Sequence, residues 1–440
     1  MTTPRMILLA DAIADDRGVI AAPGAALVQW TGAGASARVL EVGSPAMIRR
    51  VSPAQTRIRD LTGHVLLPGF VNAHCHLDLT ALGPIPFDRE PGFAGWLGQV
   101  RDRRPATDEA IADSVKEGVA RSLAGGVVAV GDIAGAWSLV PLRALRRSPM
   151  IGVSFVECFG VGERAAAAGD RLAGLLDGVE AQTDGVSVGI QPHAPYSASL
   201  ALYERAIRLA QAGGLPLSTH LAESLAEREC LVDGRGPIRD FLGSIGVWDE
   251  ASAAEFGRAR TAVSRLAEPL GRCAWLLAHV NDCTDADLAL LAGAGATIAY
   301  CPRASAHFGH PADLGPHRWR DMLEMGVPVA LGTDSIISLP ADQSDRLSVL
   351  DDARLLRRRD AADPVSLVRM MTTAGARALG LAPELFRFTP GRIAGIVAVA
   401  AGCVGRDPLA AALDSAADPT LLTRSNDSCL TGSRRSPTTA

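Results

Sequence analysis

The segment that decides the fold is PGFVNAHCHLDL, residues 68–79. An apolar run leads into two histidines, His74 and His76, which are separated only by Cys75. Residues at i and i+2 of an extended strand point to the same face, so both imidazoles face one side and the cysteine faces the other. The segment therefore predicts a buried strand that ends in a pair of ligand-type side chains.

Seven further apolar runs follow this one. They are VVAVGDI (127–133), MIGVSFVE (150–157), VSVGIQPHA (186–194), PLSTH (216–220), WLLAHV (275–280), TIAYCP (297–302) and PVALGTD (328–334). None alternates strictly between apolar and polar residues, as expected for parallel strands covered on both faces. Helical patterns such as 108–123 and 200–212 lie between the runs, and a charged helical insertion is expected over 225–265. Eight strand–helix units predict an α/β fold of the (β/α)₈ TIM-like barrel type.

The two ends of the chain lack the alternating strand–helix pattern. Residues 1–67 contain short β segments with Gly and Pro turns and no clear helix, and β character returns over 385–422. We expect these ends to pair as a small composite β-sandwich domain, which leaves 68–384 for the barrel. The Ser-, Thr- and Arg-rich stretch 423–440 is predicted to be a disordered tail.

Composition excludes several classes of protein. The 440 residues are 48% hydrophobic and 21% charged, with a net charge of −5. A nucleic-acid-binding protein would carry a basic face, and no apolar run reaches the roughly 18 residues of a membrane span. The eight cysteines form no CxxC pair, which argues against a zinc knuckle or a disulfide framework. We expect a cytoplasmic protein that binds a small-molecule substrate, with no nucleic-acid or membrane partner; a homodimer is left open.

Further ligand-type side chains stand at the ends of other predicted strands. His220 ends the fifth strand, His279 the sixth, and Asp334 the eighth. The carboxyl ends of barrel strands converge on one pocket. Three imidazoles and a carboxylate suit one divalent metal ion, for which zinc is the first expectation and iron or manganese the alternatives. A single histidine is more often a hydrogen-bonded core residue, but that reading does not explain the whole set.

Five segments together resemble the amidohydrolase superfamily. PGFVNAHCHLDL, HAPYS, STHLAES, LAHVND and LGTDS are similar to its signature segments, especially to those of its mononuclear deaminase and chlorohydrolase branch. The resemblance implies a TIM-like barrel with a composite β-sandwich. By matching motif positions it implies the metal ligands His74, His76, His220 and Asp334. It also implies that Glu223 is the proton-shuttling acid, that His279 orients the water, and that Asp334 accepts a proton from it.

The lysine content separates the subgroups of this superfamily. Two-metal amidohydrolases bridge their ions with a carboxylated lysine at the end of the fourth strand, but here that strand ends in QPHAPYS. The single lysine, Lys116, falls in a predicted surface helix. A lysine-bridged pair of ions is therefore excluded. His193, at the fourth-strand position, is expected to bind substrate, with a structural histidine as the alternative.

The segments CPRAS (301–305) and AHFGH (306–310) are similar to those of aminodeoxyfutalosine deaminases of the menaquinone route. On this resemblance we expect Arg303, His307 and His310 to contact a substrate carboxylate or sugar; a solvated loop at the barrel mouth is an equal alternative. The segment GRIAGIVAV (391–399) lacks the acidic residue usual in the family.

The expected activity is that of a metal-dependent hydrolase of carbon–nitrogen bonds in cyclic amidines. The first candidate is deamination of an adenine-type nucleoside derivative, 6-amino-6-deoxyfutalosine above others, with release of ammonia. The alternatives are an S-adenosylhomocysteine or methylthioadenosine deaminase, a guanine deaminase, and an s-triazine chlorohydrolase. A catalytically silent metal-binding barrel is the alternative from another class.

Overall fold

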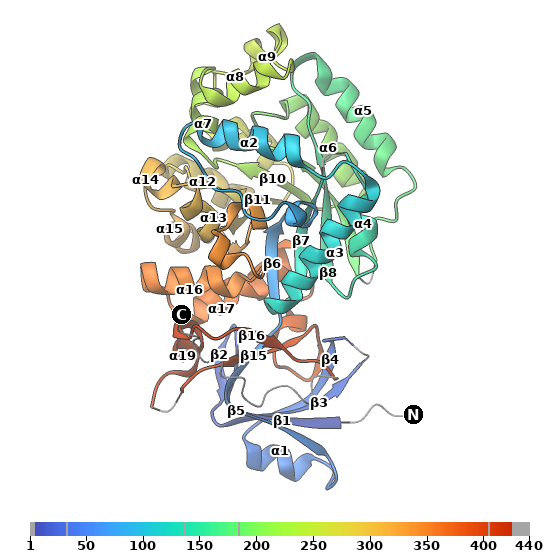
Figure 1. The fold of residues 1–440 in the computed structure, drawn as a ribbon, viewed down its shortest axis with the longest axis vertical. Coiled ribbons are helices and arrows are strands. Elements are labelled where there is room, and N and C mark those ends of the chain that lie inside the picture. The colour runs from blue at the N-terminus through green and yellow to red at the C-terminus, as the bar shows by residue number, and fades with distance from the viewer. Residues whose placement is uncertain (1–4, 32–33, 136, 184, 404, 425–440) are drawn as a thin grey trace, which may run out of the picture. The chain divides into compact units, whose positions relative to one another are not determined.

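The computed structural model describes residues 5–31, 34–135, 137–183, 185–403 and 405–424 (Figure 1). These residues form two compact units. One comprises the chain up to Gly69 and again from Glu384 onward, and the other spans Phe70–Pro383. The predicted disordered tail lies outside the described residues from position 425 onward.

The larger unit is built on an eight-stranded sheet whose strands follow one another in chain order. The strands are β6 (Phe70–Cys75), β7 (Val127–Ala134), β8 (Ile151–Cys158), β9 (Val186–Pro192), β10 (Leu217–Leu221), β11 (Trp275–His279), β12 (Thr297–Tyr300) and β13 (Val329–Leu331). Each neighbouring pair is parallel. Every residue of β6 and β7 is buried, which explains why these runs do not alternate. The predicted (β/α)₈ barrel is confirmed.

The first and last strands meet and close the barrel. Cys75 and Asp334 form a parallel bridge. The backbone N–H of His76 donates to the carbonyl of Asp334 at 2.9 Å, and the N–H of Thr333 donates to the carbonyl of His74 at 3.1 Å. This seam places the acidic residue that follows β13 beside the two histidines at the end of β6.

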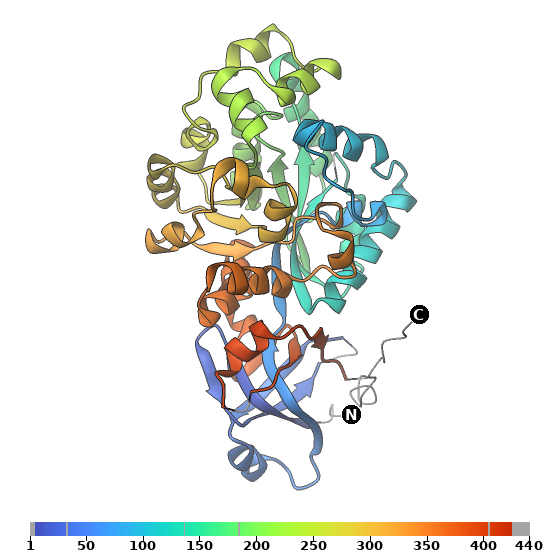
Figure 2. The ribbon, with the colours of Figure 1, turned by 60° about the vertical axis from the view of Figure 1, so that its left-hand side comes forward.

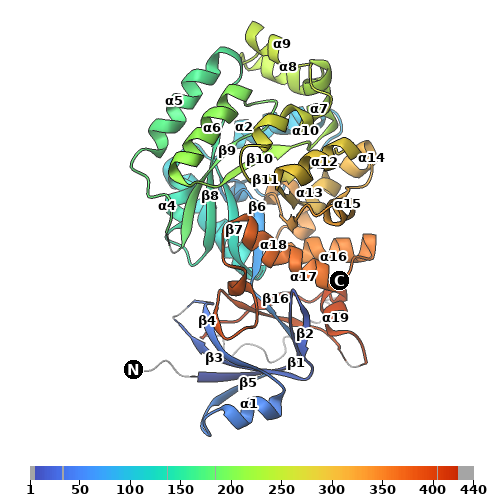
Figure 3. The ribbon, with the colours of Figure 1, turned by 180° about the vertical axis from the view of Figure 1, so that it is seen from behind.

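Helices cover the barrel, and the two predicted over 108–123 and 200–212 are present. Outside the expected insertion the covering helices are α2 (Gly92–Arg103), α3 (Asp108–Ala124), α4 (Val140–Leu145), α5 (Ala165–Leu176), α6 (Leu200–Gly213), α12 (Asp285–Ala294), α13 (Pro302–His307), α14 (His310–Leu314), α15 (Trp319–Glu324), α16 (Val349–Asp360), α17 (Pro364–Met371) and α18 (Thr373–Ala378). A capping box of Thr284 and Asp287 begins α12, and the side chain of Asp363 caps α17. Helices α5 and α6 pack side by side on the outside of the barrel (Figure 3).

The predicted insertion between β10 and β11 is helical. It contains α7 (Leu225–Arg228), a π-helical turn (Glu229–Asp233), α8 (Pro237–Ser244), α9 (Glu250–Glu255), α10 (Ala262–Arg265) and α11 (Ala267–Leu270). Figure 2 shows this yellow-green segment over one end of the barrel. Helix α8 packs against α2, and the guanidinium of Arg101 lies 5.5 Å from the ring centroid of Phe241. Segments far apart in the chain thus cover the same end of the barrel.

The smaller unit is a second eight-stranded sheet formed from both chain ends. Its strands are β1 (Arg5–Asp15), β2 (Gly18–Ala21), β3 (Gly24–Trp30), β4 (Ala37–Gly43), β5 (Arg57–Pro68), β14 (Gly391–Ile393), β15 (Ile396–Ala400) and β16 (Pro419–Leu421). The C-terminal strands β14 and β15 pair with β4 and β5. The predicted pairing of the two chain ends is confirmed, and the missing acidic residue of GRIAGIVAV does not prevent it.

Both faces of this sheet are covered by apolar contacts. Met6 and Leu8 of β1 join one apolar cluster, whereas Ile7 joins another that includes Ile48, as the period of two requires. Ile48 belongs to α1 (Pro45–Val51), and α19 (Pro408–Asp414) is a second helix of the unit. The expectation that residues 1–67 contain no helix was therefore wrong. Its signal was available, because Ser44 caps α1 and a proline follows in the first turn.

The seam of the barrel gives a test of stability. Asn72 is fully buried in β6; its Nδ2 donates to Oγ1 of Thr333 at 2.8 Å, and its Oδ1 accepts from the backbone N–H of Thr333 at 3.1 Å. Asn72→Ala removes both bonds and is expected to lower the free energy of unfolding by about 1–3 kcal/mol. Urea unfolding measures the change, with the exposed Gln211→Ala of α6 as control. An unchanged midpoint for Asn72→Ala would show that these side chains do not hold the seam.

Candidate active site

The four predicted metal ligands meet at the seam of the barrel. Nε2 of His76 lies 3.2 Å from Nε2 of His220. Oδ1 of Asp334 lies 3.6 Å from Nε2 of His76 and 3.8 Å from Nε2 of His74. One ring nitrogen from each of the three histidines lies within 4.8 Å of the others. All four side chains are buried, so the fold brings together residues that are up to 260 positions apart in the chain.

These residues fit a divalent metal ion. Among the described residues, both ring nitrogens of His74 and Nδ1 of His76 are buried without a hydrogen-bond partner, which is rare unless another group binds there. Burial, and next to it the neighbouring imidazoles, lower the pKa of His76 and His220 well below the usual value. Both rings are therefore neutral, and neutral imidazole is the form that binds a metal. Together with a carboxylate they form a donor set typical of zinc.

The geometry favours one ion over two. A further group, formed by Glu157, His193 and His220, has ligand atoms within 4.8 Å of one another. However, Nδ1 of His220 donates to the carbonyl of His193 at 2.9 Å, so only Nε2 remains, and a single nitrogen cannot serve two ions. Glu157 also lies 3.5 Å from the guanidinium of Arg104. Lys116 is exposed on α3, away from this group, as the sequence predicts.

Glu223 follows the end of β10 and lies beside the cluster. Its Oε1 is 3.5 Å from Nε2 of His279. Burial raises the pKa of Glu223 well above the usual range, and the negative charges of Asp334 and Glu227 raise it further. Burial lowers the pKa of His279 well below its ordinary value. A protonated carboxyl beside a neutral imidazole can deliver a proton to a bound molecule.

Sequence reasoning missed His317, which holds His279 in place. Nε2 of His317 donates to the backbone carbonyl of His279 at 2.9 Å. The His317 ring is buried and stacked on Tyr300, with ring centroids 3.7 Å apart. Burial lowers the pKa of His317 to about 4, so the ring is neutral and its single proton is on the nitrogen that faces the carbonyl. His317 precedes α15 and ends no strand, so no pattern in the sequence distinguishes it.

The backbone around the site is strained. Ala222, His279, Val280 and Asp334 have φ values of 53°, 72°, 52° and 59°. Residues other than glycine are uncommon in this left-handed region, and a β-branched valine there is a genuine outlier. Each such residue costs on the order of 1–3 kcal/mol. All four lie next to, or are themselves, the side chains that meet at the site.

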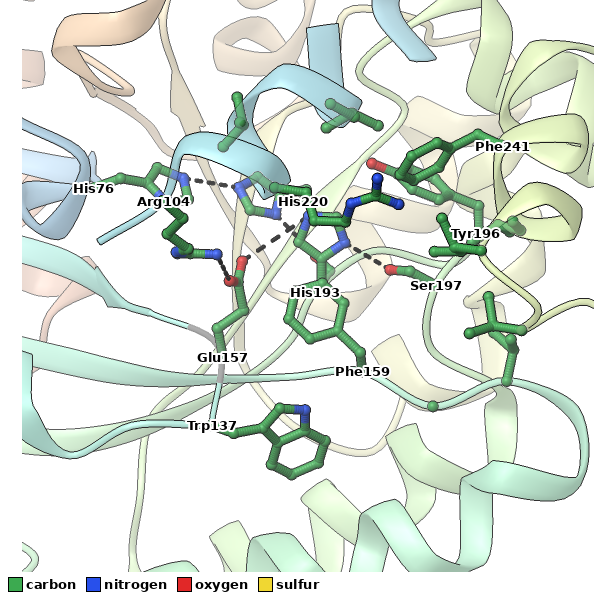
Figure 4. A pocket seen from close by; sticks show the side chains of 18 of the residues that line it. His76, Arg104, Trp137, Glu157, Phe159, His193, Tyr196, Ser197, His220 and Phe241 are labelled. Carbon is green, nitrogen blue, oxygen red and sulfur yellow. Dashed lines mark hydrogen bonds and ion pairs between the residues drawn. The ribbon is translucent and has the colours of Figure 1, made fainter. Parts of the chain in front are cut away.

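The site opens into a cavity of about 650 Å³. Polar side chains from several strand ends line it: His76, His193, His220, Glu223, His279 and Asp334. Aromatic residues and arginines complete the wall: Phe93, Trp96, Trp137, Phe159, Tyr196, Phe241, Arg101, Arg104, Arg164 and Arg171. Figure 4 shows His76, His193 and His220 together with Trp137, Phe159, Tyr196 and Phe241 around this cavity. This volume is within the range typical of small-molecule sites. The wall is predominantly apolar with a few polar groups, as expected for a site that binds an aromatic ligand.

His193 lines this cavity, as predicted for a residue that contacts substrate. Its Nδ1 lies 2.6 Å from Oγ of Ser197, whose hydroxyl donates to the carbonyl of Ala194. Nδ1 therefore carries the proton. Burial lowers the pKa of His193 to about 3, so the ring is neutral and Nε2 is a bare acceptor. This nitrogen faces Glu157, 3.9 Å away (Figure 4).

The other three predicted substrate contacts lie outside the set of residues that line the cavity. Nε and Nη2 of Arg303 donate to Asp352 at 3.0 Å and to the carbonyl of Ser348 at 3.1 Å. Its side chain is 4% exposed. His307 contacts the carbonyl of Ile85, and His310 is buried. The guanidinium of Arg303 is fully occupied by the protein, so its position does not support a contact with a substrate carboxylate.

The chain belongs to the amidohydrolase family, whose model matches residues 65–427. The family predicted from the motifs is confirmed, and with it the hydrolase class. No helix in the described part of the chain is long and apolar enough to cross a membrane.

Individual relatives are deaminases. The chain is 32% identical over 356 residues to the aminodeoxyfutalosine deaminase of Deinococcus radiodurans, with 78% of this chain and 79% of the relative covered. It is 27% identical over 365 residues to the 5-methylthioadenosine/S-adenosylhomocysteine deaminase of Natronomonas pharaonis, covering 78% and 73%. The crystal structure of Helicobacter pylori aminofutalosine deaminase with methylthio-coformycin matches the fold with a TM-score of 0.71 at 20% identity, covering 93% of this chain and 95% of that one.

Metal analysis tests the cluster. Protein purified without added metal is expected to hold one divalent ion per chain. His74→Ala should lose it because the substitution removes a ligand, and Asp334→Ala should lose it less completely. Elemental analysis measures the content, with His64→Ala, in β5, as control. Two ions per chain at full occupancy, or a normal content in His74→Ala, would contradict this assignment.

Proposed function

We propose that the chain is a metal-dependent aminohydrolase that removes the amino group of an adenine-type nucleoside derivative and releases ammonia. The observation that carries the proposal is the pairing of Glu223 with His279, 3.5 Å apart, beside the ligand cluster. A barrel that only binds a metal or a ligand has no use for a buried carboxyl of raised pKa at this place. The two relatives described above, each a nucleoside deaminase, support the same class.

The reaction begins with addition of water to the ring carbon that bears the amino group. A divalent ion held by His74, His76, His220 and Asp334 supplies, when bound, a water activated at neutral pH. Glu223 protonates the neighbouring ring nitrogen, which makes the carbon electrophilic. Asp334 accepts one proton of the attacking water, and His279 orients that water. His193 offers Nε2 as an acceptor to the bound substrate.

The second half of the reaction breaks the carbon–nitrogen bond. The proton on Asp334 passes to the amino group, which leaves as ammonia. The proton of the added hydroxyl returns to Glu223, so that a carbonyl forms at the carbon. Both carboxyl groups are then in their starting states, and one water has been exchanged for one ammonia.

The cavity supports a substrate larger than a free base. Arg164 and Arg171 line it, and among the described residues neither has a carboxylate partner. The guanidinium of Arg171 lies 4.6 Å from the ring centroid of Trp137, and Arg164 donates to the carbonyl of Gly246 at 2.8 Å. A guanidinium without an acidic partner is suited to bind a carboxylate. We therefore assign to these two arginines the contact that Arg303 does not make.

These features favour 6-amino-6-deoxyfutalosine, which carries a ribose and a benzoate carboxylate, as the substrate. The relative from Deinococcus supports this choice. S-adenosylhomocysteine is the second candidate, because it also combines an adenine, a ribose and a carboxylate, and the relative from Natronomonas supports it. Guanine and s-triazines carry no carboxylate that the two arginines could bind. For the metal ion, we propose zinc.

Glu223→Gln tests the proton transfer. Glutamine has the same shape but cannot donate and recover a proton, so turnover should fall by at least about 10²–10⁴-fold while the metal is retained. Ammonia release and elemental analysis measure the two quantities. A loss below tenfold with full metal content would assign Glu223 a structural role.

A substrate panel tests the carboxylate contact. We expect kcat/KM to fall in the order aminodeoxyfutalosine, S-adenosylhomocysteine, methylthioadenosine, adenosine and free bases. Arg164→Ala and Arg171→Ala should lower kcat/KM for the carboxylate-bearing substrates by the equivalent of about 1.5–3 kcal/mol, the value of a charged hydrogen bond. The same substitutions should change kcat/KM for adenosine little. Arg303→Ala should not discriminate between these substrates. An equal loss for every substrate in the Arg164 and Arg171 variants would contradict the assignment.

A further inference from the structure

Glu227 is a fully buried acid that the mechanism above does not use. It lies in the first turn of α7. Its Oε1 accepts the backbone N–H of Ala222 at 3.0 Å, and its Oε2 accepts the N–H of Glu223 at 2.7 Å. One carboxylate thus binds two consecutive peptide groups, and the second belongs to the proposed proton-transfer residue.

The other side of Glu223 is held as well. Nδ2 of Asn281 donates to the backbone carbonyl of Glu223 at 2.9 Å, and Oδ1 of Asn281 accepts from Oγ of Ser305 at 3.2 Å. The N–H and the C=O of Glu223 are therefore both bound by buried side chains. Neither bond belongs to a helix or a sheet, so the backbone conformation here depends on these two side chains.

Helix capping does not explain Glu227. In a capping box the acid at the third helical position accepts the N–H of the capping residue itself. Here Ser224 is the capping residue, and its Oγ accepts the N–H of Glu227 at 3.2 Å. The carboxylate of Glu227 instead reaches the two residues before the cap. The helix start is satisfied by Ser224, and the acid acts on the segment that follows β10.

The arrangement is energetically costly. Among the described residues no arginine, lysine or histidine pairs with Glu227, and its burial raises the carboxyl pKa to about 7 against the effect of its backbone hydrogen bonds. Burying a charge without a counter-ion costs free energy. Ala222, one of the two residues it binds, is held at a φ of 53°. Strained backbone that is held by costly contacts is typical of functional sites.

We infer that Glu227 is a positioning residue that, with Asn281, fixes the backbone of Glu223 so that its carboxyl faces His279 and the bound substrate. The inference rests on the proposed function, in which Glu223 transfers the proton. It gives the spacing between the two acids of THLAESLAE (219–227) a physical reason: the first acid reacts, and the second holds it.

Glu227→Gln is the test. Glutamine keeps the size of the side chain, but its amide nitrogen must face one of the two backbone N–H groups. We expect kcat to fall on the order of 10²-fold, the cost of a small misplacement of a catalytic group. KM should stay within about threefold and the metal content should be unchanged, because the substrate and metal contacts are made by other residues. An unchanged kcat would overturn the inference.

Ser224→Ala is the matched control. It removes the cap of α7 and leaves the carboxylate of Glu227 in place. We expect a similar fall in Tm for both variants but a change in kcat below about threefold for Ser224→Ala. An equal loss of kcat in the two variants would show that Glu227 only supports the helix. Should Glu227→Gln not fold, Asn281→Ala is expected to give the same selective fall in kcat, and full kcat there would overturn the inference.

Crystal structures of the wild type and Glu227→Gln separate this inference from the proposed function. We expect the backbone of Ala222 to leave its left-handed conformation in the variant and the carboxyl of Glu223 to move away from His279. An unchanged backbone would overturn the inference, and this test does not require the substrate to be known. A wild-type enzyme that releases no ammonia from any nucleoside would overturn the proposed function alone.

Discussion

The hydrogen bonds that join the end of β6 to Thr333 and Asp334, which follow β13, are the constraint on which the rest of the site depends. They convert a run of parallel strands into a closed barrel, and they place Asp334 within 4 Å of His74 and His76. His76 donates its own backbone N–H across this seam. The proposed ligands are therefore parts of the closure itself. A change that loosens the seam would separate the acid from the imidazoles before it unfolded the barrel.

Exclusion of water determines the charges at the site. Burial favours neutral imidazoles at His76, His220 and His279, and it favours a protonated carboxyl at Glu223. Each residue is thus held in the form that the proposed chemistry requires at the start. The guanidinium of Arg104 is paired with a carboxylate, since it lies 3.0 Å from Asp78. Among the charged groups that line the cavity, Arg104 is thus paired, whereas Arg164 and Arg171 have no carboxylate partner among the described residues.

The sequence predicted those parts of the site that follow from strand geometry. His74 and His76 could be placed on one face because a strand repeats every two residues, and His220, His279 and Asp334 because barrel strands end together. Arg303 lies outside the residues that line the cavity because packing brings it to Asp352, 49 residues further along the chain, and the sequence does not show this contact. His317 and Glu227 act through the backbone of other residues, and no pattern of residue types reveals such a bond. Helix α1 is a different case, since the Ser44-Pro45 signal was present in the sequence.

The four left-handed residues have a consequence for the evolution and engineering of this protein. Glycine at Ala222 would relieve the strain there with the loss of only one methyl group, so selection for heat resistance alone would favour it. The same substitution would free the backbone next to Glu223. Stability and turnover are therefore opposed at this position, as they often are at active sites. A search for thermostable variants would find gains here that come with slower enzymes, whereas gains in the sheet formed by the chain ends would carry no such conflict.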